Sequence, residues 1–229
     1  MTGFRSLFRA IAHFAKRQLR DGAVDRRAAF WDIYTRNAWG SNESVSGRGS
    51  ELGFTSRLQT ELAELLRELG IHSLADAPCG DFNWMQHVDL AGVRYLGVDI
   101  VADLIDANRR RHGREDLQFR TLDIVSEQIQ RSDLIFCRHC FIHLSNEDVR
   151  AAVSNFCKSG STWLLTTHSV EVQSNGNIES GSFRLVNLER SPFNFPPPQR
   201  MIRDDPATEG TASGFLGLWR VASLERSGH

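Results

Sequence analysis

Three aspartates stand at or beside the ends of apolar, strand-like runs in this chain of 229 residues. Asp76 closes the run HSLAD, Asp99 closes RYLGVD, and Asp123 follows LQFRTL. An ionised carboxylate accepts hydrogen bonds through both oxygens and donates none, so each aspartate is suited to hold hydroxyl or amino groups. One such acid is unremarkable, but packing does not readily explain three at successive strand ends. They predict a ligand site.

The next two runs end in histidines, whose imidazole takes up a proton near neutral pH. His139 directly follows the fourth run and is the leading candidate for a general base. His168 ends the fifth run and is the second candidate. His143 lies one helical turn after His139, and we favour a structural role for it. For every one of them, a structural hydrogen-bonded histidine is the simpler alternative.

Cys137 and Cys140 have the spacing of half a zinc site. No second pair of ligands follows at a suitable distance in the sequence. The chain has four cysteines, which are too few and too scattered for a disulfide framework. We therefore expect no metal site.

Strand-like and helical patterns alternate along the chain. Leucines from Leu58 to Leu69 recur at helical spacing and stop at Gly70, a typical helix terminator. Five strand-then-helix alternations predict an α/β fold, a doubly wound Rossmann-like and mostly parallel sheet with helices on both faces. An antiparallel C-terminal strand completes it. The expected strands are 72–79, 94–100, 117–124, 132–140, 161–169 and 215–224.

The N-terminal residues 1–50 differ from the predicted domain, 51–229. Residues 4–20 combine apolar positions at helical spacing with five basic residues. They predict a helix lying on its own domain, a membrane-surface helix or an organelle transit peptide. Residues 30–50 form an aromatic segment. Residues 171–213 are polar and proline-rich, and we expect them to overlie the ligand crevice as a substrate-side insertion.

The overall composition argues against nucleic acid and a membrane span as features of this protein. The net charge of -1 gives no basic footprint for nucleic acid. No apolar run approaches the roughly 18 residues of a membrane span. We expect a cytoplasmic protein, with peripheral membrane contact through residues 4–20 as an alternative. The oligomeric state is left open by the sequence.

The strand-end segments resemble motifs one to four of the class I S-adenosylmethionine-dependent methyltransferases, in order and spacing, over residues 72–170. LADAPCGDFNWM resembles the first motif, hydrophobic-D-x-G-x-G-x-G, with a glycine only at Gly80. Pro78 and Phe82 stand at the flanking glycine positions. The aromatic segment 30–50, called the lead-in below, resembles a bacterial subset associated with polysaccharide and natural-product gene clusters. The tail, from NLERSPFNFPPP (187–198) to FLGLW (215–219), resembles the same subset.

The resemblance implies S-adenosyl-L-methionine as the cofactor. Asp99 is placed to accept both ribose hydroxyls, and Asp123 to accept from the adenine amino group. Gly80 lets the main chain approach the methionine moiety closely. The alternatives are a turn residue for Asp99 and a helix cap for Asp123. The residues expected to bind the cofactor are Asp76, Ala77, Pro78, Gly80, Asp99, Ile100, Asp123, Ile124 and Arg138.

The acceptor is predicted from position alone. Trp39, Phe193 and Phe195 are expected to contact a small-molecule or glycan acceptor. Trp31 and Tyr34 are expected to cover the cofactor, with packing on the sheet as the alternative. Arg48 and Arg57 are expected to pair with its carboxylate, with a solvated side chain as the alternative.

The predicted function is methyl transfer to a hydroxyl of a sugar, a glycan or another small metabolite, with N-methylation still open. A non-catalytic cofactor-binding or scaffolding domain with the same fold is the alternative. A dinucleotide oxidoreductase also places an acid about where Asp99 stands, 19 residues after Gly80. It is disfavoured because a G-x-G-x-x-G turn is absent.

Overall fold

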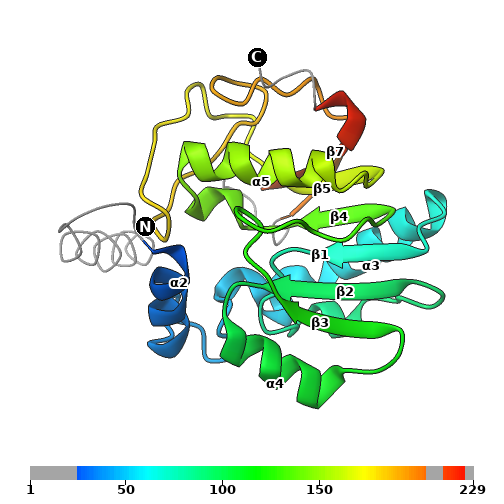
Figure 1. Ribbon diagram of the computed structural model, residues 1–229. Helices are drawn as coiled ribbons and strands as arrows, with labels where there is room; N and C mark the ends of the chain where they lie inside the picture. Colours follow the sequence, from blue (N-terminus) through cyan, green and yellow to red (C-terminus); the bar gives the residue numbers. More distant parts are fainter. Residues whose placement is uncertain (1–24, 205–213, 225–229) are drawn as a thin grey trace.

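The computed structural model describes residues 25–204 and 214–224, which contain a seven-stranded sheet of order β3-β2-β1-β4-β5-β7-β6 (Figure 1). Strands β1 to β5 are parallel, and β7 is antiparallel to both β5 and β6. The predicted fold class is confirmed. The strands are β1 (Ser73–Asp76), β2 (Arg94–Asp99), β3 (Leu117–Thr121), β4 (Leu134–Cys137), β5 (Trp163–His168), β6 (Arg200–Arg203) and β7 (Phe215–Arg220).

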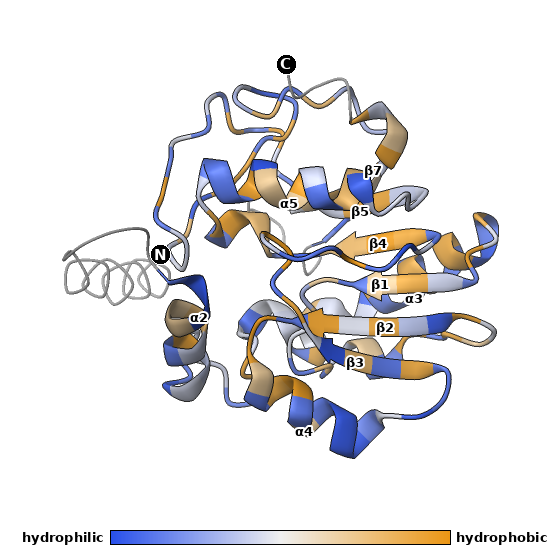
Figure 2. Ribbon diagram, viewed as in Figure 1, coloured by the Kyte–Doolittle hydropathy of each residue, from blue (hydrophilic) through white to orange (hydrophobic). Residues whose placement is uncertain are grey.

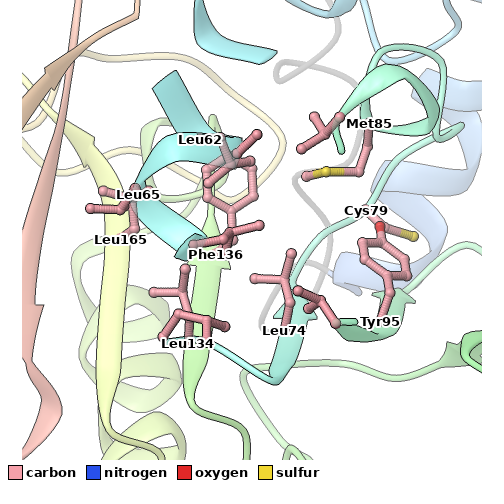
Figure 3. Close-up of a cluster of buried hydrophobic side chains, with 14 of the residues drawn as sticks. Leu62, Leu65, Leu74, Cys79, Met85, Tyr95, Leu134, Phe136 and Leu165 are labelled. Carbon is pink, nitrogen blue, oxygen red and sulfur yellow. The ribbon is translucent and has the colours of Figure 1, made fainter. Parts of the chain in front are cut away.

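The four described α-helices are α2 (Arg26–Thr35), α3 (Leu52–Glu68), α4 (Ala102–His112) and α5 (Asn146–Lys158). Buried leucines of α3, including Leu62 and Leu65, pack on one face of the sheet against Leu74, Leu134 and Phe136 (Figure 3). The apolar residues of α5 pack on the other face. The last turns of α4 are hydrophilic (Figure 2). Helices therefore cover both faces, as the alternating pattern predicts.

The parallel register brings the strand ends to one edge of the sheet. Asp76 at the end of β1 pairs with Gly97 of β2 and Phe136 of β4. Asp99 at the end of β2 pairs with Thr121 at the end of β3. Segments far apart in the sequence thus present their carboxyl ends together, where this architecture binds ligands.

Some boundaries differ from those the sequence predicts. β3 ends at Thr121, because the Asp123 carboxylate accepts from the backbone N–H of Val125 (3.0 Å) and from the hydroxyl of Ser126 (2.8 Å), which turns the chain. After β1, where the strand-then-helix alternation predicts a helix, the chain forms only a 3-10 turn, Met85–His87. The last strand ends at Arg220.

Strand β6 lies within the predicted insertion and was not expected. It is a four-residue strand on the outer side of β7, directly after the prolines at 196–198. Prolines exclude a central strand but are tolerated beside an edge strand. Residues 4–20, predicted to be helical, lie outside the described residues. In the described part of the chain, no helix is long and apolar enough to cross a membrane.

The start of β1 is held to β4 by Asp133. Its Oδ2 accepts from the backbone N–H groups of His72 and Ser73 and from the Ser73 hydroxyl, each at 2.9 Å. Burial alone raises the pKa of this carboxyl, but these hydrogen bonds outweigh it and hold the pKa below its usual value.

We expect Asp133→Ala to lower the free energy of unfolding by about 1–3 kcal/mol, because it leaves two backbone donors unpaired. The pKa of Asp133 is lower in the folded than in the unfolded chain. The contribution of the Asp133 carboxylate to the free energy of unfolding is therefore present above about pH 4 and is lost as the pH falls further. Urea unfolding at pH 7 and pH 3 measures both. Asp116→Ala, whose side chain is 59% exposed, is the control, and equal losses in the two variants contradict the assignment.

Candidate active site

Asp99 lies at the centre of the strand-end edge. Its Oδ2 accepts from the N–H of Gly80 at 3.2 Å, and its Oδ1 accepts from the N–H of Val101 at 3.0 Å. Burial raises the pKa of Asp99 to about 6, against the opposing effect of the backbone hydrogen bonds. The carboxyl is therefore mostly ionised at neutral pH, and it is already oriented by the loop after β1.

The loop after β1 follows a path that favours glycine at two positions. Gly80 has φ +53° and Phe82 has φ +59°, both in the left-handed region. Phe82 tolerates this conformation because its ring is buried edge-on against Tyr95 and Phe119. A residue standing where the motif has glycine thus keeps a glycine-like backbone.

Asp76 and Ala77 lie beneath this loop. The Tyr95 hydroxyl donates to Asp76 at 2.6 Å, and the N–H of Ala77 donates to the carbonyl of Phe136 at 2.8 Å. Burial raises the pKa of Asp76 to about 8, although the Tyr95 hydrogen bond opposes it. Asp76 is therefore protonated at neutral pH and supports the loop from within the core.

Helix α2 covers the ends of β2 and β3 (Figure 1). Arg26 pairs with both Asp123 and Asp148 at 2.9 Å, and Arg27 donates to the carbonyl of Ile100 at 3.1 Å. Burial raises the pKa of Asp123, but the hydrogen bonds from Arg26, Val125 and Ser126 outweigh it and leave the pKa below its usual value. Part of the Asp123 carboxylate is thus occupied by an arginine.

The segment between α2 and α3 packs on the loop after β1 through Asp81. This carboxylate accepts from the Ser44 hydroxyl (3.0 Å), the N–H of Val45 (2.9 Å) and the Ser46 hydroxyl (3.2 Å). A Cβ on Gly80 would lie 2.2 Å from the Ser46 hydroxyl oxygen. Glycine at position 80 therefore makes room for the lead-in.

His139 follows β4 with φ +52°, a left-handed conformation that is uncommon for a residue with a side chain. Its Nε2 lies 3.2 Å from Oδ2 of Asp204, and its N–H donates to the Thr167 hydroxyl at 2.8 Å. Burial and the charge of Arg138 lower the pKa of His139, and Asp204 opposes them. The imidazole is neutral at pH 7, which suits a proton acceptor.

Comparison with solved structures gives methyltransferases at low sequence identity. Magnesium protoporphyrin IX methyltransferase from Synechocystis PCC 6803 with bound S-adenosylmethionine has a TM-score of 0.58 and 15% identity, over 87% of this chain and 99% of that chain. Human N-acetylserotonin methyltransferase in complex with S-adenosylmethionine has a TM-score of 0.59 and 12% identity, over 95% of this chain and 68% of that chain. The N-methyltransferase NodS of Bradyrhizobium japonicum has a TM-score of 0.51 and 13% identity, over 71% of this chain and 95% of that chain.

The chain has the class I methyltransferase fold. The likeness is one of structure, since no family model and no curated protein matches the sequence.

The methyltransferase fold brings the three predicted aspartates to one edge, and the predicted Arg138 is buried close enough to Asp76 to lower its pKa. The Arg138 side chain is 4% exposed, packs over the ring of Trp84 and pairs with Asp204. Ile124 is buried, and Ile100 is half-buried beside α2. Pro78 is half-buried in the loop after β1.

The other two histidines lie in different surroundings. His168 is fully buried, its Nδ1 accepts from the N–H of Leu188 at 3.2 Å, and its Nε2 lies 3.1 Å from Glu189. Both ring nitrogens are occupied, which favours a structural role. Nδ1 of His143 lies 2.8 Å from the Ser182 carbonyl oxygen, and burial lowers its pKa to about 4.

The residues predicted to contact the acceptor are separated. The Trp39 ring lies 5.2 Å from that of His143, beside the site. Phe193 and Phe195 are buried in the core cluster of α5, where Phe195 meets Trp219 edge-on at 5.4 Å. Arg57 pairs with Glu61 on α3. Acceptor contact by these aromatic residues stays a prediction.

Three contributors were missed at the level of sequence. Arg26 sits among several arginines with no distinguishing pattern. Asp81 lies inside the first motif and received no role. Asp204 is 66 residues from Arg138, and only the antiparallel pairing of β6 with β7 brings it near. Within residues 25–204 and 214–224, no group of three or more His, Cys, Asp or Glu side chains is arranged to hold a metal ion.

We expect Asp81→Ala to release the lead-in from the loop after β1, because three donors lose their acceptor. Loss of one to two such hydrogen bonds corresponds to about tenfold faster local opening. Hydrogen exchange of the Val45 amide measures this. Asp106→Ala, which removes a half-exposed carboxylate on α4, is the control. Unchanged exchange at Val45 would show that the lead-in is held by other contacts.

Proposed function

We propose that this chain is an S-adenosylmethionine-dependent methyltransferase whose acceptor is a hydroxyl of a sugar, a glycan or another small metabolite. The observation that carries the proposal is the Asp99 carboxylate, which lies at the strand-end edge of a class I methyltransferase fold and is oriented by Gly80 and Val101. A carboxylate has about four acceptor positions. The two amides occupy two of them, so positions are left for a ribose diol.

The remaining cofactor contacts belong to the same proposal. Asp123 is proposed to accept from the adenine amino group, with Ile100 and Ile124 against the ring. The Arg26 contact with Asp123 supports a role of helix α2 next to the proposed adenine site. Gly80 is proposed to border the methionine moiety together with Ser46, which lies against it.

When bound, S-adenosylmethionine supplies a methyl group carried on a sulfonium, an electrophile that needs no further activation. The chain has to hold an acceptor in line and remove its proton. His139 is proposed as the proton acceptor, because its lowered pKa keeps it neutral at pH 7 and its side chain is partly exposed. His168 is left out of this role because both its ring nitrogens are occupied.

Residues 1–50 are proposed to close the site, and 51–229 to form the catalytic domain with 171–213 on the acceptor side. Support comes from the contacts of Arg26 and of the segment 44–46 with the strand-end edge. Membership of the bacterial subset associated with polysaccharide and natural-product clusters stays a prediction.

We expect Asp99→Ala to weaken binding of S-adenosylhomocysteine at least about 100-fold, because two hydrogen bonds to a charged acceptor are lost. Titration calorimetry of the wild type, this variant and the control Asp106→Ala measures it. Since the pKa of Asp99 is about 6, the wild-type affinity should be constant above pH 7 and fall about tenfold per unit well below pH 6. Equal affinities of the wild type and Asp99→Ala would refute the ribose contact.

We expect His139→Gln to lower kcat by about 10²–10⁴-fold with little change in KM, because the variant lacks a proton acceptor. The assay follows S-adenosylhomocysteine formation in a screen of hydroxylated sugars and metabolites. His87→Gln, an exposed histidine of the turn after β1, is the control. A loss below tenfold removes His139 from the base role.

A further inference from the structure

The Asp204 carboxylate lies between Arg138 and His139, just after the end of β6. Nε of Arg138 donates to both carboxylate oxygens at 2.9 Å, and its Nη2 lies 2.8 Å from Oδ1. The Asp204 side chain is only 2% exposed. Burial alone raises the pKa of Asp204, but the neighbouring Arg138 and His139 outweigh it and hold the pKa below its usual value. Asp204 is therefore an ionised carboxylate balanced by an arginine.

The His139 ring has one nitrogen on this carboxylate and the other beside Gly49. Nε2 lies 3.2 Å from Oδ2 of Asp204. Across residues 25–204 and 214–224, Nδ1 has no hydrogen-bond partner. A Cβ on Gly49 would lie 2.8 Å from Nδ1, so the absence of a side chain there keeps this edge of the ring clear. The nearby His143, with a pKa of about 4, is neutral at pH 7.

We propose that Asp204 is the positioning residue of a His139–Asp204 pair, which fixes the Nε2–H tautomer and leaves Nδ1 to take the proton of a hydroxyl acceptor. This inference rests on the proposed function. An ionised carboxylate has no hydrogen to donate, so Nε2 must carry the proton. The acceptor's proton then passes to Nδ1, and Asp204 stabilises the imidazolium that forms. A hydroxyl acceptor needs a base to remove its proton as it attacks, whereas a neutral amine does not need a strong one.

The geometry gives Asp204→Asn a specific consequence. Oδ1 of Asp204 faces both Nε and Nη2 of Arg138, whereas Oδ2 faces only Nε. Because Arg138 only donates hydrogen bonds, the amide oxygen of the asparagine must take the Oδ1 position. The amide NH2 group then faces Nε2 of His139, which has to become an acceptor. The proton therefore moves to Nδ1, and the ring loses its free proton acceptor without a change in its packing.

The experiment records long-range proton–nitrogen NMR spectra of the protein labelled with 15N-histidine, above the pH at which His139 titrates. His139→Gln assigns the signal among the eight histidines. In the wild type we expect a protonated Nε2 and an unprotonated Nδ1, and in Asp204→Asn the reverse. Glu189→Gln makes the same carboxylate-to-amide change beside His168 and should leave the His139 signals unchanged.

A predominant Nδ1–H tautomer in the wild type overturns the proposal, even if Asp204→Asn does not fold. An unchanged tautomer in a folded Asp204→Asn overturns it as well. The readout needs neither cofactor nor acceptor. Calorimetry with S-adenosylhomocysteine on the same wild-type sample tests the proposed function separately: lack of binding refutes that function, whereas binding with the wrong tautomer refutes only the role of Asp204.

Discussion

The hydrogen bonds from the backbone of Gly80 and Val101 to Asp99 join the loop after β1 to the end of β2, and the strand-end edge depends on them. They orient the carboxylate, and they lower its pKa, which burial alone would raise further. They also fix the path of a loop that has lost two of the motif's three glycines. Phe82 keeps the left-handed backbone of one of those positions because its ring is buried. Geometry is thus retained while the residue types change.

The N-terminal segment completes this edge at two points. Arg26 holds helix α2 on Asp123, and Asp81 holds the segment between α2 and α3 on the loop after β1. Both links are charge-assisted and join elements distant in sequence. The first lies over the proposed adenine pocket and the second beside the proposed methionine pocket. The proposed closure of the site by this segment therefore involves the same residues that are proposed to hold the cofactor.

The sequence was sufficient for the fold class, because five apolar strands alternate with helical patterns and the acids mark the strand ends. It was insufficient where contacts are long-range. Nothing local links Asp204 to His139, and the short strand β6 that precedes Asp204 lies at the sheet edge. The buried environment of His168 and Phe193 could not be read either, since histidine and phenylalanine at a strand end or in a proline-rich segment are equally compatible with a site and with the core. Spacing therefore located the candidate site, and only tertiary packing shows which of its side chains are buried in the core.

We propose that the carboxylate at the end of β2 holds the ribose of an adenosyl cofactor. A crystal structure of the protein with S-adenosylhomocysteine would show this contact. We predict both ribose hydroxyls within about 3.2 Å of the Asp99 oxygens, with the adenine between the ends of β2 and β3. Adenosine bound elsewhere on the molecule, or ribose hydroxyls that contact no carboxylate oxygen of Asp99, would refute the proposed role of Asp99.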